Sequence, residues 1–257
     1  MKNLLFLLFI LFIQCKNEEK TINDDTNSGI EQTEINVESA EKINSYSFEI
    51  EVADSVLFKK EQIKFQIKKK KINRITDVDS IIQLTKNRAI IKYDIVGNDP
   101  NNRLYYLEKI TLESGEVIYC NNHGECGLVE YYPDENIIVS ECGHSSDDCY
   151  NLLNGKSTTQ VGNPAYILES PSKKFRLNGY FPGQECSSYF MQKKTNGQYL
   201  KVFEINEVYP YKNVPENFCN MENLFWSDDY TLNFSIKNYK DKNTGIDEYY
   251  KLKVKEF

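Results

Sequence analysis

The side chains best suited to chemistry lie between residues 120 and 219, where the chain has six cysteines and two histidines. They are Cys120, Cys126, Cys142, Cys149, Cys186, Cys219, His123 and His144. An even number of cysteines in an exported chain predicts disulfides, because thiols oxidise in pairs outside the cytoplasm. Such bonds would hold loops in place without taking part in a reaction.

Sequence spacing favours one set of pairings and leaves the other sets open. The favoured pairs are Cys120–Cys126, Cys142–Cys149 and Cys186–Cys219. The first two bonds would each clamp a short loop between expected strands. The third would close a longer loop, which in the chain-entropy model contributes roughly 3 kcal/mol to the free energy of unfolding.

Zinc is the main alternative for this region, because thiolates and imidazoles are its usual ligands. The two groups that could hold a metal are Cys120-x2-His123-x2-Cys126 and Cys142-x-His144-x4-Cys149. Neither has the paired Cys-x2-Cys spacing of zinc knuckles. Disulfides are therefore favoured, no cofactor is expected, and His123 and His144 are the alternative metal ligands. A third hypothesis is a nucleophilic Cys126 beside His123, which would need a lowered thiolate pKa.

Other patterns that could signal catalysis are absent or have a turn function. The sequence has no Gly-x-Ser-x-Gly elbow, no phosphate-binding glycine loop and no His-Glu-x-x-His motif. Close carboxylates occur at Asp77/Asp79, Asp147/Asp148 and Asp228/Asp229. Each pair falls in a predicted turn, where aspartate caps backbone amides. We therefore identify no catalytic residue from the sequence.

A segment with two prolines is the weak candidate for partner binding. Tyr209 and Tyr211 flank Pro210, and Pro215 follows shortly after. Prolines exclude a central strand here, so the tyrosines are expected on a stiff loop, where rigid aromatic side chains suit partner contacts. The alternative is that both tyrosines fold back over the domain.

The first residues of the chain predict export. Lys2 is followed by an apolar run from Leu4 to Ile13, and then by Gln14 and Cys15. The run is too short for a spanning helix, which needs roughly 20 residues, and fits the apolar region of an export signal. The segment resembles the signal of bacterial lipoproteins, although Gln14 replaces the small residue that this family prefers. The resemblance implies removal of residues 1–14 and acylation of Cys15. The alternative is an uncleaved apolar N-terminus with an incidental cysteine.

The residues that follow predict a tether. Residues 16–20 read Lys-Asn-Glu-Glu-Lys, which is similar to the surface-export signals of Bacteroidetes lipoproteins. Residues 15–42 contain no aromatic side chain and too few apolar ones to fold alone. As a flexible coil they would span about 30 Å. The resemblance implies a lipid-anchored protein of the cell envelope, on the periplasmic face of the outer membrane or at the cell surface.

Composition narrows the class of partner and the class of fold. The formal net charge is −7 and the isoelectric point is near 5.1. Nucleic-acid binding needs a basic footprint, so we expect no nucleic-acid partner. Aromatic residues make up 13% of the chain, and this enrichment favours strands over helices.

Alternation of apolar and polar residues predicts strands at the start of the folded domain. The residues from Tyr46 to Val52 alternate in this way, and so do Ile63, Phe65 and Ile67. The lysine run at residues 68–71 is typical of a solvated strand end or edge.

Residues 43–257 predict an all-β domain with about four degenerate repeats. The first strands of the copies are Ala89–Tyr93, Ile137–Ser140, Phe175–Leu177 and Thr231–Ile236. The tyrosine-led second strands are Tyr105–Leu107, Tyr150–Leu152, Tyr189–Met191 and Tyr249–Leu252. Tight turns are predicted at Ser114-Gly115, Asn154-Gly155 and Asn196-Gly197. The pattern resembles the blades of WD40 or TolB-like β-propellers, and an antiparallel β-sandwich is the alternative. The single tryptophan, Trp226, is expected in a buried strand.

These features together favour a membrane-anchored envelope lipoprotein whose β domain binds a protein or glycan without catalysis. An inhibitor or an immunity-type protein that neutralises a toxin is one version of this hypothesis. The alternatives are a metal-dependent extracytoplasmic hydrolase, which would use His123 and His144, and a structural envelope protein with no specific ligand.

Overall fold

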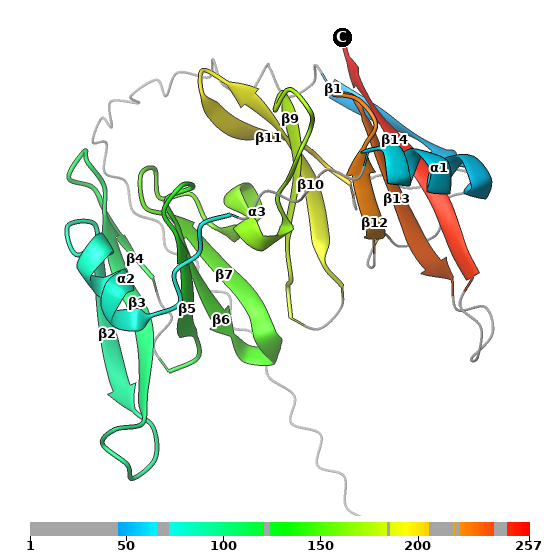
Figure 1. Ribbon diagram of the computed structural model, residues 1–257. Helices are drawn as coiled ribbons and strands as arrows, with labels where there is room; N and C mark the ends of the chain where they lie inside the picture. The colour runs from blue at the N-terminus through cyan, green and yellow to red at the C-terminus, as the bar shows by residue number, and fades with distance from the viewer. Residues whose placement is uncertain are drawn as a thin grey trace, which may run out of the picture. The chain divides into compact units, whose positions relative to one another are not determined.

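The computed structural model describes residues 46–65, 72–120, 124–183, 186–205, 218, 221–238 and 246–257. All of them lie in one compact unit, Ala40–Phe257 (Figure 1). The predicted signal and tether, residues 1–42, and the lysine run at residues 68–71 lie outside the described residues.

Within these residues, fourteen strands form four antiparallel sheets. One three-stranded sheet has the order β2 (Ala89–Ile95), β3 (Arg103–Thr111), β4 (Val117–Tyr119). Another has the order β5 (Gly127–Tyr132), β6 (Ile137–Cys142), β7 (Ser146–Asn151). A four-stranded sheet has the order β11 (Gln198–Glu204), β10 (Ser188–Thr195), β9 (Phe175–Tyr180), β8 (Leu168–Glu169). The last has the order β1 (Tyr46–Val52), β14 (Ile246–Glu256), β13 (Thr231–Asn238), β12 (Met221–Trp226). The prediction of an all-β domain is confirmed.

The first and second strands of each predicted repeat pair with each other. The four antiparallel pairs are β2–β3, β6–β7, β9–β10 and β13–β14. The turn between β10 and β11 has Asn196 and Gly197 at positive φ, 51° and 83°, which is the geometry that Asn-Gly favours. The propeller resemblance remains a prediction, supported by the meander order of the sheets.

The strand at the start of the domain pairs with the strand at its end. In Figure 1, β1 (blue) runs beside β14 (red), and their register extends from Tyr46 opposite Glu256 to Val52 opposite Tyr250. The predicted strand from Tyr46 to Val52 is confirmed. This pairing ties two ends of the folded unit into one sheet.

The predicted strand through Ile63 and Phe65 is wrong, because these residues lie in helix α1 (Ser55–Phe65); Ile67 lies outside the described residues. Asp54 starts the helix by accepting hydrogen bonds from the amides of Val56 and Leu57 at 3.0 and 2.9 Å. Local capping and the burial of one helix face outweigh a short stretch of alternation.

Among the described residues, two further α-helices and two 3-10 turns connect the sheets. They are α2 (Val78–Thr85), α3 (Thr158–Val161), η3 (Gly143–Ser145) and η4 (Pro164–Tyr166). In the part of the chain that the structure describes, no helix has the length and apolar character to cross a membrane.

The largest hydrophobic core joins the sheet that contains β1 to the sheet that contains β9. Trp226, Phe234 and Leu252 from the first pack with Phe175 and Met191 from the second, and all are buried. The expected burial of Trp226 is confirmed. A second core lies under α2, where its buried residues include Ile81, Leu107, Ile110, Ile138 and Leu152.

Candidate ligand-binding cavity

A cavity of about 940 Å³ lies between three segments that are far apart in sequence. They are residues 72–76, which lead into α2; residues 132–135, in the turn between β5 and β6; and residues 165–173, which run from η4 through β8 toward β9. Its walls combine apolar side chains, such as Ile72, Ile167 and Leu168, with charged ones. Volume and mixed lining are typical of a small-ligand site.

The wall before α2 is fixed by contacts to β5. The backbones of Ile75 and Tyr131 exchange two hydrogen bonds of 2.9 Å. Arg74 Nη1 then lies 3.0 Å from Glu130 Oε1, and the hydroxyl of Tyr132 donates to the same carboxylate. Burial raises the pKa of Tyr132 above its ordinary value. The phenol therefore stays protonated and acts as a hydrogen-bond donor at neutral pH.

The wall formed by η4 and β8 is fixed from two sides. Asn163 caps η4 by accepting from the amide of Ala165 at 3.0 Å, and its Nδ2 donates to Asp147 at 2.8 Å. On the second side, Trp226 belongs to the largest hydrophobic core, and its Nε1 donates to the carbonyl of Leu168 at 3.0 Å. Since Leu168 lines the cavity, the indole of Trp226 is linked directly to its wall.

A buried arginine lies behind the cavity. Only 4% of the Arg176 side chain is exposed. Its Nη1 donates to Glu135 Oε2 at 2.8 Å and its Nε to Gln192 Oε1 at 2.6 Å. The guanidinium lies over the ring of Tyr199, 3.9 Å from the centroid. A fixed cation therefore holds the carboxylate of Glu135 in the cavity wall.

Glu169 is the second carboxylate held by neighbours in this wall. Lys173 Nζ lies 3.6 Å from its Oε2, and the hydroxyl of Tyr199 donates to its Oε1 at 3.4 Å. Burial, followed by the charge of Glu169, raises the pKa of Tyr199 to about 12.

These contacts determine what the cavity can do chemically. Glu135, Glu169 and Arg74 each have a partner of opposite charge, so they offer fixed hydrogen-bond donors and acceptors to a ligand. The apolar side chains between them offer a surface for a sugar ring or an aliphatic or aromatic side chain. This is an arrangement for binding an amphipathic group.

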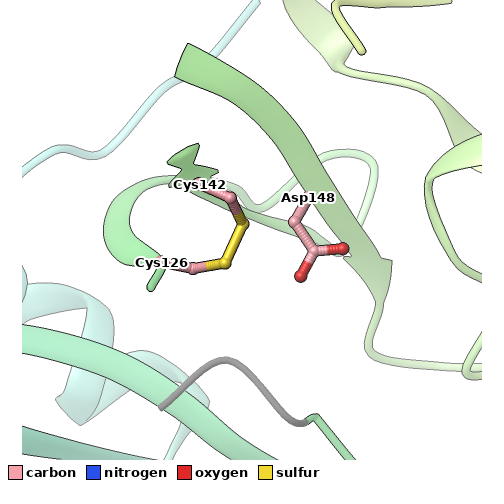
Figure 2. Close-up of side chains that lie close together, drawn as sticks. All are labelled: Cys126, Cys142 and Asp148. Carbon is pink, nitrogen blue, oxygen red and sulfur yellow. A yellow bond between two sulfur atoms is a disulfide. The ribbon is translucent and has the colours of Figure 1, made fainter. Parts of the chain in front are cut away.

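The cysteine region contains one described disulfide, between Cys126 and Cys142. Figure 2 shows Asp148 beside this bond, and the two sulfur atoms and a carboxylate oxygen lie within 4.8 Å of one another. A metal would need these sulfur atoms as thiolates. Because each is bonded to the other, the group acts here as a covalent clamp across the β5–β6 hairpin.

The predicted pairings Cys120–Cys126 and Cys142–Cys149 are therefore wrong, and strand register explains why. The β5–β6 pairing sets Gly127 opposite Glu141, which brings the neighbouring residues Cys126 and Cys142 together. The β6–β7 pairing sets Cys149 opposite Val139, three residues away from Cys142. Strand register therefore predicts disulfide pairing better than the presence of two cysteines on either side of a loop.

Cys120 and Cys149 are buried free thiols. Burial raises the pKa of Cys120 to about 12, and the nearby Asp148 adds to this shift. Burial also raises the pKa of Cys149 well above its ordinary value. Both side chains are thus in the thiol form at neutral pH, which is unsuited to nucleophilic or metal-binding roles.

The remaining predicted cysteine and histidine sites are placed only in part. Cys186 is disulfide-bonded, and Cys219 lies outside the described residues, as do His123, Tyr209 and Tyr211. His144 lies in η3 with a positive φ of 59° and is exposed.

The prediction that the paired aspartates cap turns is confirmed for one residue of two pairs, Asp77 and Asp228. It is wrong for the third pair. Asp77 caps α2, with its side chain accepting from the amide of Ser80 at 2.9 Å. Asp228 caps the turn before β13 by accepting from the amides of residues 230 and 231. The pair Asp147/Asp148 lies instead within strand β7. There Asp147 accepts from the amide of Phe181 at 2.7 Å, a contact with the adjoining sheet.

The sequence analysis identified none of the charged residues of the cavity. The charged residues that line it lie in three separate segments, and no spacing marks them as a group: Arg74, Asp134, Glu135, Glu169 and Lys173. The one local sign was charge next to a turn, at Asp134 and Glu135, and that pattern is common on protein surfaces.

The chain as a whole matches no protein-family model, no curated protein and no solved structure.

Proposed function

We propose that this protein is a lipid-anchored protein of the cell envelope whose β domain binds a protein or glycan partner through the cavity at residues 72–76, 132–135 and 165–173. The observation that carries the proposal is the cavity itself, where Arg74, Glu135 and Glu169 are held in ion pairs beside apolar side chains. Such a lining suits recognition of an amphipathic group.

The proposed anchor is the acylated side chain and N-terminus of Cys15. Two or more acyl chains hold a protein at a membrane, since each buried methylene contributes about 0.8 kcal/mol. A long tether would leave the cavity free to meet a partner at a distance from the bilayer. Binding without reaction, as in an inhibitor or immunity-type protein, agrees with the ion pairs that hold Glu135 and Glu169.

Site-specific photo-crosslinking in cells tests the binding proposal. A photo-reactive benzoylphenylalanine is placed at Ala165, an exposed residue that lines the cavity. The matched control carries the same group at Asn87, an exposed residue after α2. We expect crosslinked products at position 165 that are missing at position 87. Identical products at both positions, or none at either, would contradict binding through the cavity.

Acylation is tested separately by feeding cells an alkyne-labelled fatty acid. Wild-type protein should take up the label and fractionate with membranes, whereas Cys15→Ser should carry no label. Label that persists in Cys15→Ser would disprove the anchor while leaving the result at the cavity unaffected.

A further inference from the structure

The outward face of α1 combines exposed apolar side chains with lysines. Val56, Leu57 and Ile63 have exposed fractions of 75, 45 and 79%. The lysines at positions 59, 60 and 64 are exposed as well. We call these six residues the basic face of α1.

The opposite face of α1 holds the helix firmly on the sheet that contains β12 and β14. Phe58 is fully buried, with ring centroids 5.1 Å from Phe225 and 4.6 Å from Tyr249. Gln62 Nε2 donates to the side chain of Asn223 at 3.2 Å. The basic face is therefore presented by a fixed helix.

Charge on this helix is divided between its two faces. Glu61 is the one acidic residue from Ser55 to Phe65, and its carboxylate turns toward the sheet, where Lys251 Nζ lies 3.0 Å away. The basic face thus carries three lysines and no carboxylate, in a protein whose net charge is −7. Its partner should be anionic with an apolar layer beneath the charge.

We propose that the basic face of α1 docks on an anionic lipid surface, with the lysines at the headgroups and Val56, Leu57 and Ile63 at the acyl boundary. Lysine side chains can keep their ammonium groups at the headgroups while their stems and the neighbouring aliphatic side chains reach the acyl boundary. Each lysine near an anionic bilayer strengthens association about fivefold. A flat bilayer also suits a convex helix face better than a small solute does.

This inference rests on the proposed acyl anchor, which brings α1 within reach of a membrane. As a flexible coil, residues 15–42 would span about 30 Å. A tether of that length would let α1 reach the bilayer without any rearrangement of the fold. The docked helix would limit the orientations of the domain and so decide where the cavity faces.

The test uses the full-length acylated protein in vesicles of brominated phosphatidylcholine, with or without phosphatidylglycerol. Bromine quenches indoles that lie at the acyl boundary. The variant Ile63→Trp reports on the basic face, and Ile95→Trp, at a residue on β2 that is 54% exposed, is the matched control. The native Trp226 is fully buried and supplies the same background in both.

We expect quenching of Ile63→Trp in vesicles with phosphatidylglycerol, and much less in neutral vesicles or at position 95. Adding Lys60→Glu and Lys64→Glu should lower the docking constant at least about 25-fold, from about fivefold for each lysine, and abolish the quenching. The charge-matched control, Lys86→Glu with Lys194→Glu at exposed positions, should retain it. Equal quenching at positions 63 and 95 would overturn the proposal. So would quenching at position 63 that is unchanged by Lys60→Glu with Lys64→Glu.

Flotation separates failure of the anchor from failure of the docking. Acyl chains insert into neutral vesicles, so protein that does not float with phosphatidylcholine alone contradicts the anchor. In that case the same protein is floated with vesicles that contain phosphatidylglycerol. Flotation that is lost in the double variant Lys60→Glu with Lys64→Glu would still show that the basic face binds anionic lipid. Flotation without quenching at position 63 supports the anchor and rejects the docking.

Discussion

Arg176 holds Glu135, one of the residues that line the cavity. It is almost completely buried, and it connects Glu135, Gln192 and the ring of Tyr199. The buried guanidinium is stabilised by a carboxylate and an amide oxygen, which accept from its Nη1 and Nε. Removal of the charge would leave those oxygen atoms beside an apolar surface.

Arg176→Met should lower the free energy of unfolding by about 3 kcal/mol, because it leaves the partners of a buried ion pair uncompensated. Urea unfolding followed by the fluorescence of Trp226 measures the change. The control is Lys173→Met, whose half-exposed ion pair with Glu169 should contribute less than about 1 kcal/mol. Equal losses in the free energy of unfolding for the two substitutions would show that burial does not make the Arg176 ion pair more stabilising than an exposed one.

The pKa of Cys120 predicts how stability depends on pH. The folded value is about 12 and the ordinary value is 9.0, so the unfolded thiol ionises first as pH rises. The stabilising contribution is complete below pH 9 and is lost as pH increases toward 12, by at most about 1.4 kcal/mol per pH unit. Cys120→Ala should show a shallower fall than wild type in urea unfolding above pH 9. The same slope in both proteins would contradict burial of this thiol.

At the scale of elements, the β5–β6 hairpin connects the disulfide to the cavity. One end carries the disulfide between Cys126 and Cys142, and the other end carries Glu135 at the cavity. A bond that closes the open end of a hairpin restricts the unfolded chain and preserves the register of both strands.

Cys126→Ser with Cys142→Ser should destabilise the domain by about 3 kcal/mol, the chain-entropy value for a loop of this size; the two cysteines are 16 residues apart in sequence. Thermal unfolding of both proteins with and without a reductant checks the effect. Reductant should lower the wild-type midpoint more than that of the variant, because the disulfide of Cys186 is reduced in both proteins and the Cys126–Cys142 bond only in wild type. A variant as stable as oxidised wild type would show that the bond does not constrain the unfolded state.

At the scale of the whole molecule, pairing of β1 with β14 joins the first and last described strands. Glu256 also contacts Lys174 and Lys193 from the neighbouring sheet, at 3.1 and 3.2 Å. Val254 is buried in the shared core and its amide donates to the carbonyl of Tyr230 at 2.8 Å. The end of the chain is therefore part of the structure that holds two sheets together.

A chain that ends at Lys253 should unfold at a temperature roughly 5 °C lower than wild type, because it loses a buried valine and the ion pairs of Glu256. A chain that ends at Glu256 should match wild type, since only the exposed Phe257 is removed. Differential scanning calorimetry measures both midpoints. Identical midpoints for the two truncations would contradict this account of β14.

Local patterns in the sequence were sufficient for the class of fold. Alternation with a period of two and the turns Ser114-Gly115 and Asn196-Gly197 predicted the hairpins β3–β4 and β10–β11, because side-chain direction in a strand and positive φ at glycine are properties of neighbouring residues. The same rule failed at Ile63 and Phe65, where a cap at Asp54 and burial of Phe58 favour a helix. The third predicted turn, Asn154-Gly155, is followed by helix α3 and not by a strand.

The amino-acid sequence alone thus determined the acidic charge and the all-β class, and it predicted most of the strands from short stretches of chain; the acyl anchor stays a prediction. Tertiary structure decided the partner of Cys142, the burial of Arg176 and the cavity. Glu135 and Arg176 are 41 residues apart, and Cys126 meets Cys142 through the register of two strands. Such contacts depend on how sheets pair and pack, and no local spacing encodes them.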